Sequence, residues 1–167
     1  IQNVSATDRL LGRSTAGAGV IEEITCTAAG RAILDDADAA AQRTTLGLST
    51  GILNVSFGDG VNTITTGVAG YVQVPFAVTI TGWDIIGDVS GSIVVDVWND
   101  TYANFPPVVA DSIAGTEKPT LSSAQKNQDL TLSTWTTSLS ANTWLGFNVD
   151  SVTTLKKVTL SLRYTRA

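Results

Sequence analysis

The sequence predicts a mainly β chain. A C-terminal antiparallel β-sandwich of jelly-roll-like type is expected to follow a β-hairpin and two short helices that form an oligomerisation stem. Apolar and polar residues alternate through residues 51–167, and no helical period appears there. The chain also contains 24 threonines and 14 serines, the short hydroxyl side chains typical of exposed β-sheet. Residues 1–50 are rich in alanine and lack aromatic residues. We therefore predict two domains, 1–50 and 51–167.

Alternation is clearest in 157–164, where Val158, Leu160 and Leu162 share one face with Tyr164 and polar residues occupy the other. The remaining strands are predicted at 52–57, 61–66, 71–76, 77–86, 92–98, 129–133 and 143–149. In 77–86 the apolar residues change parity at Gly82, which predicts a bulge or bend.

Eight short strands separated by glycine and proline turns favour a sandwich or jelly roll over the alternative, a closed barrel. The segment 99–126 contains Pro106-Pro107 and is too long for a hairpin turn. We expect it to form the long crossover of a Greek key.

In the first domain, residues 9–13 and 20–24 flank a glycine-containing stretch and predict a β-hairpin. Arg9 and Arg13 on one arm face Glu22 and Glu23 on the other, so cross-strand ion pairs are expected.

Two short helices follow the hairpin in the prediction. Thr27 is the expected N-cap of a helix at 28–34, and Asp35 or Asp36 that of a second helix at 37–45. Gly47 fits the position just after the second helix. Helices of this length, rich in alanine, are marginal alone.

All aromatic residues lie beyond residue 50, so the first domain lacks the side chains that contribute most to a core. We therefore expect this segment to be stabilised by association with other copies. Its larger apolar residues are the candidate oligomerisation contacts: Leu10, Leu11, Val20, Ile21, Ile24, Ile33, Leu34 and Leu46. Cys26 is expected to be a buried small hydrophobic residue.

Composition excludes several classes of function. The chain has no histidine and one cysteine, which removes histidine-based catalysis, an intrachain disulfide and a multi-thiolate zinc site. A net charge of -5 argues against nucleic acid as a partner. The sequence contains no run of 18 apolar residues, so we expect no membrane-spanning helix. No secretory signal is visible, and the absence of methionine suggests that Ile1 lies partway along a longer protein.

Two runs in the first domain, ATDRLLGRSTAGAGVIEEI and TAAGRAILDDADAAAQRTTLGL, resemble segments of tailed-bacteriophage tail fibres and related virion appendage proteins. There an R-L-L-G-R hairpin and an A-A-G-R-A-L-L-D-D helix precede a distal domain, and this chain has Ile33 in place of the first leucine. The second domain is similar to a β-domain at the C-terminal end of such proteins. The resemblance implies a homotrimer on the virion surface, in contact with other tail or capsid proteins.

The densest group of aromatic and amide side chains predicts a glycan contact, with rings that stack on sugars and polar groups that bind hydroxyls. Its members are Trp98, Asn99, Asp100, Tyr102 and Asn104. The alternative is a strand end and loop whose rings pack into the sandwich. Trp83 is expected in the core, whereas Trp144 is expected at the surface or an interface.

Oxygen ligands at Asp96, Asn99 and Asp100 match no EF-hand spacing, so we predict neither a metal site nor any cofactor. The paired carboxylates at Glu22-Glu23 and Asp35-Asp36 do not suit glycoside hydrolysis, since neighbours on a strand point to opposite faces and the aspartates suit helix caps. We therefore expect no enzyme.

The preferred hypothesis is a trimeric phage fibre or appendage, located on the virion, whose distal β-sandwich attaches to a bacterial surface polysaccharide. The alternative is a head fibre or capsid decoration (cement) protein with a purely structural role. A polysaccharide-cleaving spike is disfavoured because the chain offers neither a histidine nor a clear carboxylate pair.

Overall fold

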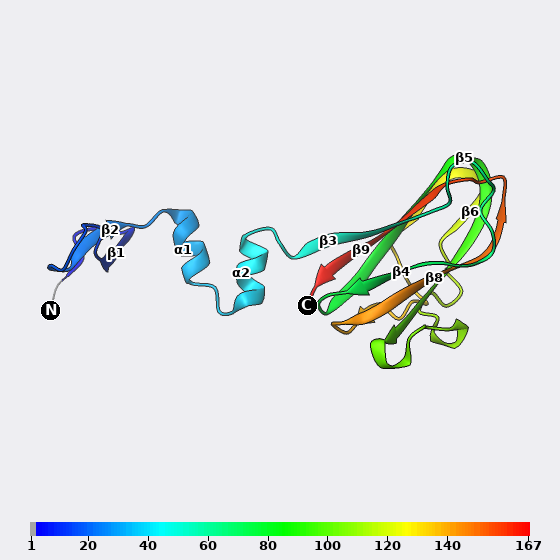
Figure 1. Ribbon diagram of the computed structural model, residues 1–167. Helices are drawn as coiled ribbons and strands as arrows, with labels where there is room; N and C mark the ends of the chain where they lie inside the picture. Colours follow the sequence, from blue (N-terminus) through cyan, green and yellow to red (C-terminus); the bar gives the residue numbers. More distant parts are fainter. Residues whose placement is uncertain (1–2) are drawn as a thin grey trace. The chain divides into compact units, whose positions relative to one another are not determined.

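The computed structural model describes residues 3–167 and divides the chain into two compact units, one ending at Ser49 and the other spanning Thr50–Ala167 (Figure 1). The second unit is folded from β-strands, and both helices belong to the first, so the mainly β fold class is as predicted. No helix in the described part of the chain is long and apolar enough to cross a membrane.

The first unit begins with the expected hairpin, in which β1 (Arg9–Gly12) pairs antiparallel with β2 (Glu22–Thr25). The second strand starts later than predicted because the loop carbonyls of Gly17 and Val20 accept hydrogen bonds from the Arg13 guanidinium. Arg13 also forms the expected ion pair with Glu22, at 3.0 Å.

The other predicted charge pair of the hairpin is replaced by hydrogen bonds to hydroxyl and backbone groups. Arg9 donates to the hydroxyl of Thr25, and Glu23 accepts from the backbone N–H of Ser5 at 2.7 Å. Both charged side chains are therefore held locally, without a direct Arg9–Glu23 contact.

Helix α1 (Ala28–Leu34) is capped as predicted, by the Thr27 hydroxyl, which accepts from the Gly30 N–H. Helix α2 (Ala39–Thr45) begins two residues later than predicted, and the prediction of Asp35 or Asp36 as its cap is wrong. Asp38 is the cap, because its carboxylate accepts from the N–H groups of both Ala40 and Ala41. Gly47 follows the helix with φ +70°, as expected for its position.

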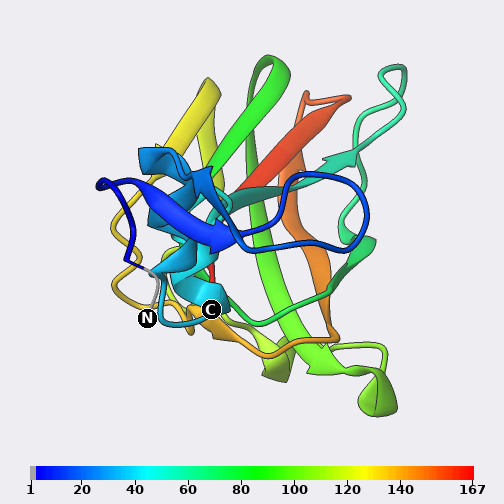
Figure 2. The same cartoon turned by 90° about the vertical axis from the view of Figure 1, so that its left-hand side faces the viewer.

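The second unit contains one antiparallel sheet of seven strands, curled into two facing layers (Figures 1 and 2). The main strand order is β3-β9-β5-β8-β4, and β6 and β7 pair with β5. Their bounds are β3 (Thr50–Phe57), β4 (Gly67–Val74), β5 (Val78–Thr101), β6 (Thr120–Asp129), β7 (Ser138–Leu139), β8 (Thr143–Thr153) and β9 (Val158–Arg166).

Strand β5 joins the two layers because it runs through both. Its first part, from Val78 to Gly87, pairs with β9, and its second part, from Ser92 to Thr101, pairs with β8. The segments predicted as separate strands, 77–86 and 92–98, are therefore parts of one strand. The predicted bulge at Gly82 is present, since the register with β9 shifts between Ile80 and Gly82.

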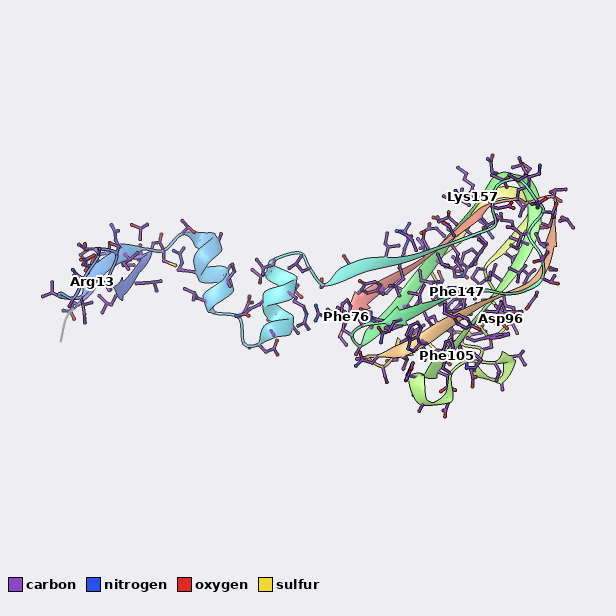
Figure 3. All side chains as sticks on the ribbon, in the orientation of Figure 1. Arg13, Phe76, Asp96, Phe105, Phe147 and Lys157 are labelled. Atoms are coloured by element: carbon purple, nitrogen blue, oxygen red, sulfur yellow. The ribbon has the colours of Figure 1, made fainter. Side chains whose placement is uncertain are left out.

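The hydrophobic core lies between the two layers, and its fully buried members run from Phe57 to Leu162 in the sequence. Phe57 on β3 faces Phe147 on β8, with ring centroids 6.0 Å apart. Figure 3 shows Phe147 in the middle of this unit. The alternation in β8 and β9 places Leu145, Val149 and Leu160 in the same core, as the sequence predicted.

Three predicted segments differ in the structure. Residues 61–66 are not a strand, because the Asp59 carboxylate accepts from the N–H groups of Val61 and Asn62 and holds a turn. Of the predicted strand 129–133, only Asp129 belongs to a strand, as the last residue of β6; its carboxylate accepts from the Thr131 N–H, and residues 130–133 are irregular.

The segment 99–126, predicted as one loop, contains two short 3₁₀ helices, η1 (Tyr102–Asn104) and η2 (Val109–Asp111), and the start of β6. Most side chains of β6 are exposed and polar, so this strand shows no apolar alternation that the sequence analysis could detect.

A pair of glycines in the turn after β3 gives a matched test of this packing. Both have a positive φ, +82° at Gly58 and +77° at Gly60, but a Cβ at Gly58 would lie 2.1 Å from the Lys156 carbonyl oxygen, whereas Gly60 is in open space. We expect Gly60→Ala to cost about 1 kcal/mol of folding free energy and Gly58→Ala about 3 kcal/mol, because only the second adds a steric clash. Urea unfolding of both variants measures this difference, and equal losses would contradict the packing of the turn.

Candidate functional site

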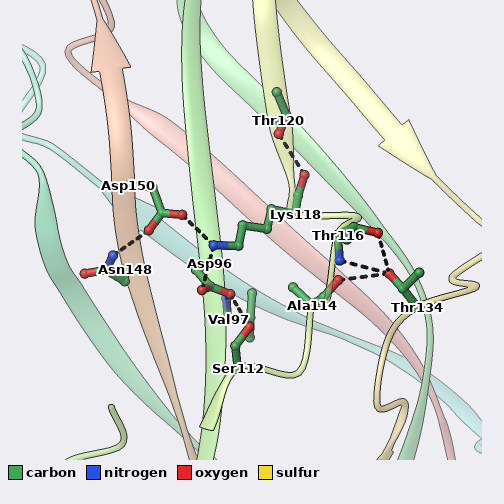
Figure 4. Close-up of polar contacts among 10 residues, drawn as sticks. All are labelled: Asp96, Val97, Ser112, Ala114, Thr116, Lys118, Thr120, Thr134, Asn148 and Asp150. Carbon is green, nitrogen blue, oxygen red and sulfur yellow. Dashed lines mark hydrogen bonds and ion pairs between the residues drawn. The ribbon is translucent and has the colours of Figure 1, made fainter. Parts of the chain in front are cut away.

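The residues that the sequence analysis singled out as a binding site lie at the end of β5, where it pairs with β8, and in the following helix η1. Residues 112–119 lie along the edge of β5 opposite β8, because the Ile113 N–H donates to the Val97 carbonyl and the Val95 N–H donates to the Pro119 carbonyl. The Lys118 side chain extends from this segment over the outward face of β5 (Figure 4). The outward-facing Asp96 and Trp98 are only 1% and 9% exposed. Both faces of β5 are covered here, one by the core and one by side chains of this segment.

A polar network joins this segment to β5 and β8 (Figure 4). One carboxylate oxygen of Asp96 accepts from the Ser112 hydroxyl at 2.6 Å and from the Val97 N–H at 2.9 Å. The other lies 3.0 Å from the Lys118 ammonium, which also lies 2.7 Å from the Asp150 carboxylate. Asn148 donates to the second oxygen of Asp150 at 2.7 Å.

The charges of this network stabilise one another. Burial raises the pKa of Asp96, but the hydrogen bond from Ser112 and the contact with Lys118 outweigh it and hold that pKa below its ordinary value. The hydrogen bond to Asp150 and the contact with Asp96 raise the pKa of Lys118. At neutral pH Asp96 is therefore an anion and Lys118 a cation, and the pair ties segment 112–118 to the sheet.

An aromatic cluster lies on the same sheet, where β8 pairs with β4. The Phe105 ring lies between Tyr71, at 4.8 Å between centroids, and Trp144, at 5.7 Å. Pro107 is buried beside Gly146, where an added Cβ would lie 3.0 Å from its ring. Tyr71 and Phe105 remain 39% and 41% exposed, so the cluster also has a free surface.

The five predicted glycan contacts have different environments. Trp98 has no free ring face, which corresponds to the alternative of packing into the fold. Asn99 is half-buried and donates to the Thr143 hydroxyl at 3.0 Å. Asp100 accepts from the Asn104 side chain at 3.1 Å, and Tyr102 is 75% exposed. Tyr102 and Asn104 are thus exposed, and Asp100 is half-buried.

The sequence places Phe105 at the end of this group, but it does not show that Tyr71 and Trp144 pack against the Phe105 ring, because the three residues come from separate segments. Trp144 was expected at the surface or an interface and is half-buried in the cluster. Trp83 lies in the core, 4% exposed, as expected. In the described residues, no group of three or more Asp, Glu, Cys or His side chains is arranged to hold a metal ion.

Most of the predicted oligomerisation contacts lie on the surface of the first unit. Leu10, Leu11, Val20, Ile21, Leu34 and Leu46 are exposed, and Ile24 and Ile33 are half-buried. Cys26 is buried, at 6% exposure, and its carbonyl accepts from the Arg31 guanidinium at 2.7 Å.

No family model matches this chain, and no curated protein matches it significantly. One solved structure, described as "Structure of infectious bursal disease virus Gx strain", is similar at 12% identity and a TM-score of 0.25. The match covers 95% of this chain and 43% of that one, so the chain spans less than half its length. A similarity of this size carries no argument about fold or function.

The ion pair is tested by Lys118→Met, which keeps the length of the side chain and removes its charge. We expect a loss of about 2–3 kcal/mol at neutral pH, because the buried Asp96 carboxylate loses its cation while the partly exposed Lys118 site admits some water. Since the folded-state pKa of Asp96 is lowered, the contribution of this carboxylate is complete above its unfolded pKa of about 3.9 and is lost as the pH falls through the folded value.

The difference between the wild type and Lys118→Met should therefore shrink as the pH falls below about 4. Urea unfolding between neutral and acidic pH measures it, with Lys157→Met as the control, because Lys157 is exposed. A loss that is the same at both pH values would show that packing, not charge, is responsible.

Proposed function

We propose that this chain is a non-enzymatic structural protein of a bacteriophage virion: a homotrimeric fibre or appendage. In this proposal the first unit associates with other copies and the β-sandwich attaches to glycans of the host surface. The resemblance of the RLLGR hairpin and the AAGRAILDD helix to tail-fibre segments supports the virion assignment.

The observation that carries the proposal is the contrast in burial between the two units. In the described part of the first unit, Cys26 is the one buried hydrophobic residue. Eight large hydrophobic side chains there are 43–81% exposed: Val4, Leu10, Leu11, Val20, Ile21, Leu34, Leu46 and Leu48. Exposed apolar surface of this extent marks an interaction site.

The second unit, in contrast, has its own hydrophobic core between two layers, which is the property of a domain that folds independently. Its exposed Tyr102 and Asn104, next to the Phe105 cluster, supply ring faces and amide groups of the kind that contact sugars. These observations support the proposal that the first unit associates with other copies and the second unit binds glycans.

Association is tested by replacing two exposed leucines of the helices, Leu34→Asp and Leu46→Asp, in the full chain. We expect the wild type to be a trimer and the double variant a monomer, because three copies cannot bury these carboxylates together. Light scattering measures the mass. The control is Ala37→Asp, at an exposed position between the helices, which adds one such charge without removing a large apolar side chain.

A wild type that is monomeric at every concentration would contradict the proposal. Labelling of intact virions with an antibody to the chain then distinguishes a tail appendage from the alternative, a head fibre or capsid decoration protein.

Glycan attachment is tested with Tyr102→Ala and Asn104→Ala on an array of bacterial surface polysaccharides. We expect the wild type to bind and each variant to lose about tenfold in affinity, since a stacked ring or a polar pair contributes roughly 1.4 kcal/mol. Val109→Ala in the same loop is the control, because its exposed side chain has no polar group. If the Tyr102 and Asn104 variants bind as tightly as the wild type, these residues do not contact the glycan, and its binding site lies elsewhere on the domain.

A further inference from the structure

The two end strands of the sheet in the second unit, β3 and β4, each have a backbone edge that pairs with no strand in the described chain. The curled sheet brings parts of β3 and β4 near one another. No strand pairing joins them. We define the seam as Thr50–Phe57, Gly67–Val74 and the loop 58–66 that connects them.

The core is incompletely covered at the seam. Leu53 and Val55 on β3 and Val72 on β4 point inward but are only partly buried. By comparison, Leu145 on β8 and Leu160 on β9 are 0% exposed. A recess of about 330 Å³ opens at the loop end of the seam, between Phe57, Ile64 and Val68. Apolar surface that would be internal in a closed sandwich is therefore accessible here.

The seam also lacks the features that protect exposed strand edges. Such edges normally carry charged residues, especially lysine, or proline. Neither β3 (TGILNVSF) nor β4 (GVAGYVQV) contains either, although a bulge between Val68 and Gly70 interrupts β4. Strand β6, at another edge, carries Lys126 and Asp129. Ile52 and Val68 are 54% and 43% exposed, so the unprotected edges are apolar as well.

Charge favours a second copy of this chain as the occupant. Each copy has a net charge of -5, so two copies repel unless they meet through uncharged surfaces. The seam is such a surface, because Asp59 is its one charged residue and donors from Val61 and Asn62 already bind that carboxylate.

Chain continuity favours the same occupant. Strand β3 starts at Thr50, directly after the unit that exposes eight large hydrophobic side chains. If copies associate through that unit, their β3 strands are tethered at an effective concentration on the order of millimolar. A contact too weak to form between free domains then forms within the oligomer.

We propose that the seam is the surface through which the β-sandwiches of neighbouring copies contact one another, edge against edge. This inference rests on the proposed association of the first unit. The trimer then has a second interface, made by β3 and β4. In this arrangement the β-sandwiches of neighbouring copies contact one another and are not separate.

Charge placed on the seam tests the proposal. Asn54→Lys on β3 and Gln73→Lys on β4 change exposed side chains, so each copy should still fold. In the full chain, we expect the double variant to dissociate on dilution at about tenfold higher concentration than the wild type, a change of ~1.4 kcal/mol. Gln128→Lys on the exposed face of β6 is the control, and sedimentation analysis is the measurement. Equal dissociation of the wild type and the seam variant would overturn the proposal.

Hydrogen exchange separates failure of the seam from failure of the stem. We expect amides in 50–57 and 67–74 to exchange more slowly in the wild-type oligomer than in the full-length Leu34→Asp, Leu46→Asp variant, with 122–128 unchanged. An oligomer without this protection overturns the seam and leaves association of the first unit intact. A monomeric wild type overturns both. If the amides of 50–57 and 67–74 in the variant exchange slowly only after host polysaccharide is added, the seam binds a glycan, and the proposed contact between copies is wrong.

Discussion

Strand β5 is the element on which the second unit depends. It has 24 residues, belongs to both layers, and pairs with β6, β7, β8 and β9. The layers meet because this strand turns from one into the other, where its register with β6 is interrupted between Ile86 and Gly91. At Gly91 a Cβ would lie 2.7 Å from Leu155, which is fully buried, so the turn and the core are packed against each other. Because β5 is the central strand of the order β3-β9-β5-β8-β4, the outer edges of the sheet along this order belong to β3 and β4.

Coverage of the outward face of β5 follows from the same arrangement. In its second part, inward Val95 and Val97 contact the core, while outward Asp96 would face solvent if segment 112–118 were absent. The contact of Asp96 with Ser112 and Lys118 holds that segment and stabilises the buried carboxylate. The sheet therefore has a buried part at Asp96 and Trp98, and exposed residues at Tyr102 and Asn104.

The first unit is organised by a different kind of interaction. Local hydrogen bonds hold it, such as those from Arg13 to the hairpin loop and those from the helix N–H groups to Thr27 and Asp38. Such contacts satisfy polar groups but bury little apolar surface, and each exposed pair contributes only about 0–1 kcal/mol. Folding of this unit is therefore tied to association in our proposal, whereas the second unit supplies its own core.

Sequence patterns correctly predicted the features that depend on residues close together in the chain. Alternation identified β8 and β9, Thr27 and Gly47 marked helix ends, and the parity change at Gly82 located a bulge. These signals are local because a strand face or a cap involves residues a few positions apart. The capping rule did not identify the right residue at the start of α2, because Asp35, Asp36 and Asp38 are all suitable N-cap residues. In the structure the cap is Asp38.

Tertiary structure alone decided which distant segments meet. No pattern in the sequence shows that Lys118 reaches Asp96 and Asp150, that Phe105 packs between Tyr71 and Trp144, or that polar β6 pairs with β5. Partners more than ten residues apart are selected by strand order and register, which depend on the free energy of the whole packed sheet. The sequence therefore determined which residues face inward along each strand with clear alternation, and the fold decided which of the outward-facing residues are exposed.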